Sequence, residues 1–97
     1  MLASNMANAH LIEKEEVNGF AFLPVEMDKY QAEDIRKRLF DAMMLGNSHH
    51  HKVHIAFNTA DGQKQVYTTI WATTDNFIIL KGGKYIPINS VEKVALD

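Results

Sequence analysis

The segment QVYTTIWATT, residues 65–74, contains the only tryptophan of the chain and has the composition of a β-strand. In a strand, successive side chains point to opposite faces. One face would then carry Val66, Thr68, Ile70 and Ala72, and the other Tyr67, Thr69, Trp71 and Thr73. If the aliphatic face is buried, two aromatic rings about 13 Å apart remain outside. The fold and the role of these two rings are therefore linked questions.

Further strands are expected on both sides of this segment, because the side-chain pattern has a period of two from Lys52 onward. The turn signals between them are Asp61-Gly62, Asp75-Asn76, Gly82-Gly83 and Asn89-Ser90. These turns divide residues 52–97 into five short strands, the second of which covers 63–74. The run Phe77–Leu80 is apolar throughout, as in a strand covered on both faces. Pro87 lacks a backbone N–H, so its strand should lie at an edge or contain a bulge.

Residues 28–46 are expected to form a helix. Asp28 and Gln31 have the spacing of a capping box, and Gly46-Asn47 is a typical helix end. Between these signals, apolar residues recur at steps of three and four positions. The stripe consists of Ala32, Ile35, Leu39, Ala42 and Met43. It predicts a helix with one face packed on the strands.

The N-terminal arm, residues 1–27, has two open interpretations. A short helix within 6–19 would end at Asn18-Gly19, which is a reasonable helix terminator. The same dipeptide could instead form a hairpin turn. Residues 20–25 are an apolar connector in either case, and Pro24 argues against a central strand there.

Length and composition restrict the class of protein. Ninety-seven residues with 46% hydrophobic side chains suffice for a single domain with its own core. The absence of cysteine excludes disulfides and cysteine nucleophiles. The net charge is −2, with −3 in residues 1–46 and +1 in 47–97, which is no strongly basic field. The opening residues lack the features of a signal peptide and the apolar runs are short, so we expect a cytoplasmic protein without a membrane span.

A helix followed by a five-stranded meander resembles the small barrels of SH3-type and Sm-like proteins. The resemblance covers about residues 28–97 and rests on the Asp61-Gly62 turn, the strand 76–80 and the link 88–91. It implies a mainly β fold, a five-stranded antiparallel barrel with one packed helix, and for Sm-like proteins single-stranded RNA binding. The Lys-His of the bacterial RNA chaperone has no counterpart here, where 85–88 reads Tyr-Ile-Pro-Ile. The sequence also resembles, in its general character, small uncharacterised bacterial proteins, and this resemblance implies no function.

The strongest candidate for a binding site combines the two exposed rings with nearby lysines. Its residues are Tyr67, Trp71, Lys52, Lys81 and Lys84. Such a surface could stack single-stranded nucleic acid or bind an apolar peptide. Alternatively, the strand bends near Thr68-Thr69, and Trp71 turns inward or is covered by the helix or by residues 20–25.

Four histidines, His49, His50, His51 and His54, are the candidates for metal binding, because imidazole is a good ligand for zinc, copper and nickel. Adjacent histidines on a loop point in different directions, which does not suit one closed site. We therefore expect an exposed, pH-sensitive loop and no metal cofactor.

Three consecutive cations, Arg36, Lys37 and Arg38, lie on the predicted helix. Glu33 and Asp34 precede them at distances suited to pairing along a helix. The pattern predicts a solvated, ion-paired face, with phosphate contact as the alternative.

No arrangement of residues predicts catalysis. The neighbours Asp41, Ser48 and His49 are close in the chain, but sequence proximity does not make a triad. The turn aspartates 61 and 75 and the terminal Asp97 have no partner nearby in sequence. We therefore expect a non-catalytic binding module without a cofactor or small-molecule substrate. Its function would be protein–protein interaction or self-association, through the Tyr67/Trp71 face or an open strand edge near Pro87, with single-stranded RNA binding as the alternative.

Overall fold

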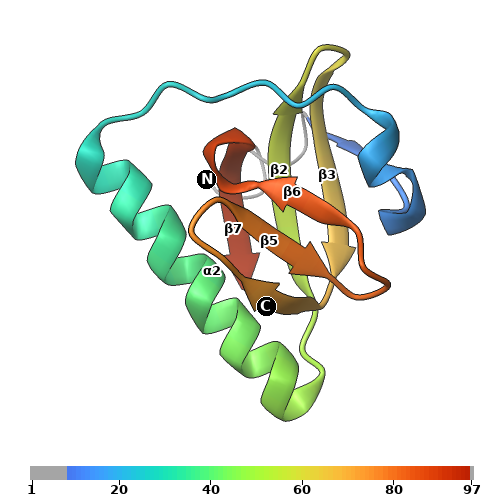
Figure 1. The fold of residues 1–97 in the computed structure, drawn as a ribbon, viewed down its shortest axis with the longest axis vertical. Helices are drawn as coiled ribbons and strands as arrows, with labels where there is room; N and C mark the ends of the chain where they lie inside the picture. Colours follow the sequence, from blue (N-terminus) through green and yellow to red (C-terminus); the bar gives the residue numbers. More distant parts are fainter. Residues whose placement is uncertain (1–8, 97) are drawn as a thin grey trace.

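Two β-sheets and one long helix make up the part of the chain that the computed structural model describes, residues 9–96 (Figure 1). The predicted start of the arm and Asp97 lie outside these residues. In chain order the elements are β1 (His10–Leu11), the 3₁₀ helix η1 (Lys14–Gly19), α2 (Lys29–His49), β2 (Val53–Thr59), β3 (Gly62–Thr68), β4 (Ile70–Thr73), β5 (Phe77–Leu80), β6 (Tyr85–Pro87), the 3₁₀ turn η2 (Ile88–Ser90) and β7 (Val91–Leu96).

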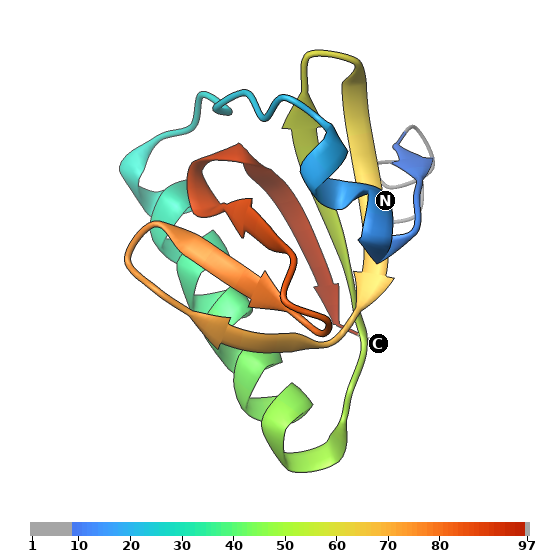
Figure 2. The same ribbon diagram turned by 45° about the vertical axis from the view of Figure 1, so that its right-hand side comes forward.

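The strands divide into two sheets, with the orders β1-β3-β2-β7 and β4-β5-β6. The second sheet lies across the first, and the core fills the space between them (Figure 2). The prediction of a mainly β fold with one packed helix is confirmed. The five-stranded barrel is wrong, because the strands separate into two sheets. The strands of residues 52–97 pair with one another in antiparallel fashion, as predicted, and the one parallel pair among the described strands joins β1, in the arm, to β3.

The predicted strand 63–74 is broken at Thr69, where the chain passes from the first sheet to the second. Thr68 and Thr69 are both buried, although neighbours in a straight strand would point to opposite faces. The end of α2 packs against this corner. A Cβ atom on Gly46 would lie only 2.8 Å from the carbonyl oxygen of Ile70 and from Cγ2 of Thr69.

The helix α2 begins as its sequence predicts. Asp28 Oδ1 accepts a hydrogen bond from the Gln31 backbone at 2.8 Å, and Gln31 Oε1 accepts one from the Asp28 backbone at 3.0 Å. The predicted end at Gly46-Asn47 is too early, since the helix continues to His49 and His50 caps it in the left-handed conformation. Gly46 is needed inside the helix for the close contact with the corner, and there it does not act as a terminator.

Of the two predicted forms of the N-terminal arm, the structure has the helical one, over Lys14–Gly19. A 3₁₀ helix ends at Gly19, and Asn18-Gly19 makes no hairpin. Residues 20–27 then cross the top of the molecule in Figure 1 and are tied to their own chain by backbone hydrogen bonds. Ala21 accepts from Ala60, Leu23 donates to Asn58, and Val25 donates to Asn89, at 2.8–3.0 Å. The arm therefore covers the β2–β3 hairpin and the start of η2.

Candidate interaction surfaces

The corner at Thr69 separates the two aromatic residues that the sequence placed on one face. Tyr67 lies on β3 opposite His54, on the outer face of the first sheet. Trp71 lies on β4, in the second sheet. The strand bends as the alternative interpretation expected, yet Trp71 does not turn inward, since half of its surface is exposed. The two rings do not form a single platform.

Trp71 occupies a β-bulge. In the pairing of β4 with β5, Ile70 lies opposite Leu80 and Ala72 lies opposite Ile79, so Trp71 has no residue opposite it. A bulge bends its strand and re-aims a side chain. Ile70 is fully buried, whereas the next residue, Trp71, projects from the outer side.

The outer face of β4, β5 and β6 carries an apolar surface, which we call the aromatic face. Its members are Trp71, Ala72, Phe77, Ile79, Tyr85 and Pro87. The strand register places Ala72, Ile79 and Tyr85 in one row, and Phe77 opposite Pro87. Phe77 and Tyr85 form an edge-to-face pair with ring centroids 5.3 Å apart, and both side chains are exposed. The expectation that Phe77–Leu80 is covered on both faces is therefore wrong, because only Ile78 and Leu80 are buried.

A second surface surrounds Tyr67. Its ring stacks on His54 with centroids 4.3 Å apart, and Lys52 Nζ lies 5.6 Å from the ring centroid. Tyr67, Lys52 and Lys81 line a hollow of about 300 Å³ together with Lys14. We call this region the basic hollow. The structure thus brings together three of the five predicted site residues and leaves Trp71 on the other sheet.

The arm contributes charges to the basic hollow that the sequence did not predict. Lys14 lines the hollow beside Glu13 and forms an ion pair with Glu15 at 2.9 Å. The hydrogen bond from Lys14 lowers the pKa of the Glu15 carboxyl, and the charge of Lys84 adds to the effect. No local pattern relates residue 14 to residue 67, so only the folded arm could reveal this contact. Lys84, a predicted site residue, does not line the hollow, and its charge acts on Glu15.

The four candidate histidines occupy different positions in the structure. His49 ends α2, His50 caps it, and His54 stacks on Tyr67. Within residues 9–96, no group of three or more His, Asp or Glu side chains could hold a metal ion together.

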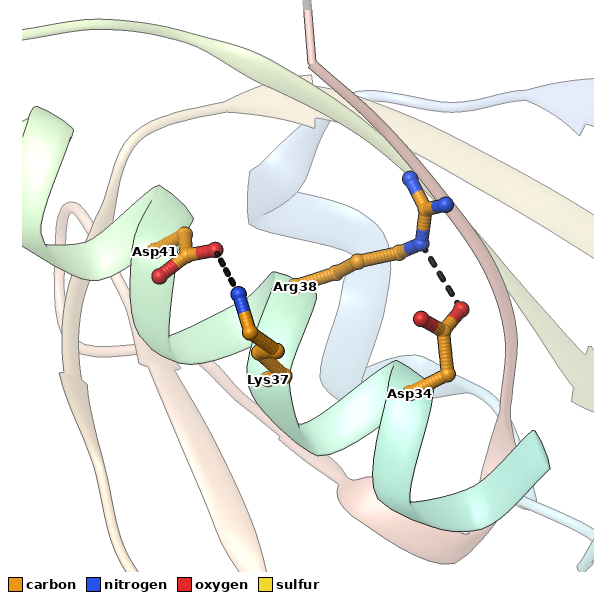
Figure 3. Close-up of polar contacts among 4 residues, drawn as sticks. All are labelled: Asp34, Lys37, Arg38 and Asp41. Atoms are coloured by element: carbon orange, nitrogen blue, oxygen red, sulfur yellow. Dashed lines mark hydrogen bonds and ion pairs between the residues drawn. The ribbon is translucent and has the colours of Figure 1, made fainter. Parts of the chain in front are cut away.

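Two of the three consecutive cations of α2 form ion pairs along the helix (Figure 3), but only Arg38 pairs with a predicted upstream partner, since Lys37 pairs with Asp41. Arg38 Nε lies 2.8 Å from Asp34 Oδ2, and Lys37 Nζ lies 3.4 Å from Asp41 Oδ2. Both pairs are solvent-exposed, so each contributes about 0–1 kcal/mol. Arg36 points elsewhere and lines a hollow with Phe77 and Pro87, at the margin of the aromatic face.

The strand edge near Pro87 is not open. Asn18 Nδ2 donates to the Tyr85 carbonyl oxygen at 2.8 Å, and the Tyr85 backbone N–H donates to Asn18 Oδ1 at 3.2 Å. The side-chain amide thereby makes the two hydrogen bonds that a neighbouring strand would make. Pro87 itself has no N–H to offer. The prediction of a docking edge on this strand is therefore wrong.

Comparison of the chain with protein-family models, curated proteins and solved structures gives no match. The resemblance to SH3-type and Sm-like proteins therefore stays a prediction. Among the described residues, no helix combines the length and apolar character that crossing a membrane requires.

Proposed function

We propose that this protein is a non-catalytic interaction module of the cytoplasm that binds a protein partner through the aromatic face. The observation that carries the proposal is the grouping of Trp71, Phe77 and Tyr85 on the outer side of one sheet, all three exposed. Contiguous exposed apolar patches mark interaction sites. Tryptophan and tyrosine are also the residues that dominate binding energy at protein interfaces.

The charges at the margin of the aromatic face indicate the chemistry of the partner. Arg36 lies at the Phe77 and Pro87 end, and the β5–β6 hairpin carries Lys81 and Lys84. Asp75, in the turn between β4 and β5, is the acidic exception. A partner with an apolar centre and acidic groups at its rim would complement this arrangement.

Single-stranded nucleic acid is the second candidate, and the basic hollow supports it. Lys14, Lys52 and Lys81 converge there beside Tyr67. However, a base that stacks on Tyr67 would compete with His54 and Lys52, which already contact the ring. Glu13 also lines the hollow and opposes phosphate. We therefore rank this function below protein binding.

Affinity capture from a cell extract, with matched variants as bait, tests the proposal. We expect a protein that binds the wild type and Tyr67→Ala but is lost with Trp71→Ala. Its binding should persist at about 0.5 M salt, because apolar contacts are little affected by screening. A ligand that is instead lost with Tyr67→Ala would contradict the assignment to the aromatic face.

A titration with a fluorescently labelled single-stranded oligonucleotide, followed by its anisotropy, distinguishes the second candidate, because it detects binding at the basic hollow as well as at the aromatic face. We expect no tight binding, and Trp71 should stay accessible to quenching by iodide. Tight oligonucleotide binding that weakens steeply with salt, and is lost with Lys52→Ala and Lys81→Ala, would favour nucleic acid instead.

A further inference from the structure

One of the three consecutive cations of α2 has no partner among the described residues. Lys37 and Arg38 are each paired with an aspartate of the same helix (Figure 3). Arg36 forms no ion pair or hydrogen bond with any described residue, including Glu33, three positions before it. Arg38 faces β7, whereas Arg36 lies beside the second sheet. One guanidinium is therefore available on the flank of α2 that adjoins the aromatic face.

Two hollows meet at Arg36, because this residue and Ile88 line both of them. One has a volume of about 410 Å³ and includes Phe77 and Pro87 of the aromatic face. The other has a volume of about 370 Å³ and continues along α2 to Phe40, which is half exposed. We call the two hollows together the Arg36 groove. It extends the aromatic face across the end of the second sheet to the helix.

The Arg36 groove combines an apolar lining with a single available charge. Phe22 and Pro24 of the arm add to the apolar lining at the Phe77 end. Lys37, the other cation of the groove, is held by Asp41. None of the described acidic residues lines either hollow, in contrast to the basic hollow, which includes an acid. The groove thus complements a ligand that has one negative charge between two apolar groups.

We propose that the Arg36 groove binds a segment of the protein partner in which an aspartate or glutamate lies between two apolar side chains. The inference rests on the function proposed for the aromatic face, because Phe77 and Pro87 belong to both surfaces. The carboxylate accepts two hydrogen bonds from the Arg36 guanidinium, whose planar fork suits this geometry. The apolar side chains fill the two hollows. An internal acid fits better than a terminal carboxylate, because the partner has to continue in both directions from Arg36.

Both parts of the motif are needed for binding. A carboxylate that pairs with an exposed arginine gains little in water. Apolar side chains on either side of the pair exclude water, and a charge pair is stronger where water is excluded. Acidic peptides without apolar flanks should therefore bind weakly, and so should apolar peptides without the acid.

Selection from a random dodecapeptide library displayed on phage, with the full chain as bait, tests the inference. We expect the enriched peptides to share an acidic residue with an apolar residue on each side. Enriched peptides that lack this pattern would overturn the inference. So would a selection that yields no enrichment over a support without the protein.

Titration of one enriched peptide against matched variants locates its acid. Arg36→Met should weaken binding at least about tenfold, as loss of one member of a buried charge pair does. Arg38→Met is the control, since it removes the same residue type from the other flank of α2, and it should change binding by no more than about twofold. Exchange of the peptide acid for its amide should weaken binding to the wild type equally and binding to Arg36→Met no further. Two independent losses would refute the contact.

Two further variants separate this inference from the function proposed for the aromatic face. Peptide binding that is weakened by Trp71→Ala but not by Arg36→Met would leave the aromatic face as the binding site and refute the groove. Binding that is lost only with Tyr67→Ala would contradict both. Loss with Arg36→Met and with Phe40→Ala, in proteins whose thermal melts show that they are folded, would support the groove along its whole length.

Discussion

Tyr67 and Trp71 lie four residues apart in one alternating segment, yet their rings have different surroundings in the fold. The ring of Tyr67 is stacked on His54 and lies below Lys52. Trp71 stands in a bulge on the other sheet, with half of its surface exposed. The corner at Thr69 makes this difference, because it assigns the two rings to different sheets. Both rings are exposed, but the ring before the corner is held by contacts with neighbouring side chains, whereas the ring after it projects from a bulge.

The two rings lie on different sheets because of the corner at Thr69, and a substitution that disturbs this corner should cause the largest loss of stability. Gly46→Leu would force a side chain into the contact with the Ile70 carbonyl and Thr69. We expect it to lower the free energy of unfolding by about 3 kcal/mol, as overpacking does. Leucine is a good helix former, so helix propensity would not explain the loss. Urea denaturation measures the change, with the exposed Asn47→Leu as control, and equal midpoints for both variants would contradict the account.

The side chain of Asn18 makes two hydrogen bonds with the Tyr85 backbone, at the edge of the aromatic face. Asn18→Ala removes two hydrogen bonds and should lower stability by about 1–2 kcal/mol. It should also expose the β6 edge and increase concentration-dependent aggregation. Light scattering during thermal unfolding reports on both effects. Asn18→Asp should be impaired as well, because its carboxylate would face the Tyr85 carbonyl oxygen, and a wild-type melt for that variant would rule out these hydrogen bonds.

Truncation of each ring measures how much it contributes to stability. Tyr67→Ala should cost about 1 kcal/mol, the usual worth of an aromatic pair beyond its buried area. Trp71→Ala should change stability by no more than about 0.5 kcal/mol, as exposed substitutions usually do, although the ring is larger. Chemical denaturation of both variants decides this. A larger loss for Trp71→Ala would mean that tryptophan belongs to the core.

The smallest expected change is in the pKa of the Glu15 carboxyl, in the arm. Lys14 lowers the pKa of Glu15 from its ordinary value of 4.5. A depressed carboxyl pKa stabilises the folded state above the ordinary value, and this contribution disappears as the pH falls through the folded-state value. Lys14→Met should raise the pKa of Glu15 towards 4.5, as measured by NMR titration of its carboxyl carbon. An unchanged titration curve would show that the ion pair is absent in solution.

The candidate site could be predicted from the sequence only in part. Alternation identified Tyr67 and Trp71 as outward-facing rings, and both are exposed. Phe77 and Tyr85 were missed, because an unbroken apolar run does not show which of its members is covered. Lys14 and Asn18 were missed for another reason, since their contacts join residues more than fifty positions apart.

The elements that could be predicted correctly are those whose causes lie within a few residues. The Asp28 and Gln31 side chains begin α2 from within one helical turn, and the turns at Asp61-Gly62 and Gly82-Gly83 depend on the backbone freedom of glycine. The tertiary structure decided the corner at Thr69, the bulge at Trp71 and the closed edge at Tyr85. Each of these arises where distant segments compete for the same buried space or the same backbone hydrogen bonds. The local sequence pattern does not show which of these segments will be neighbours, so the outcome is visible only in the folded structure.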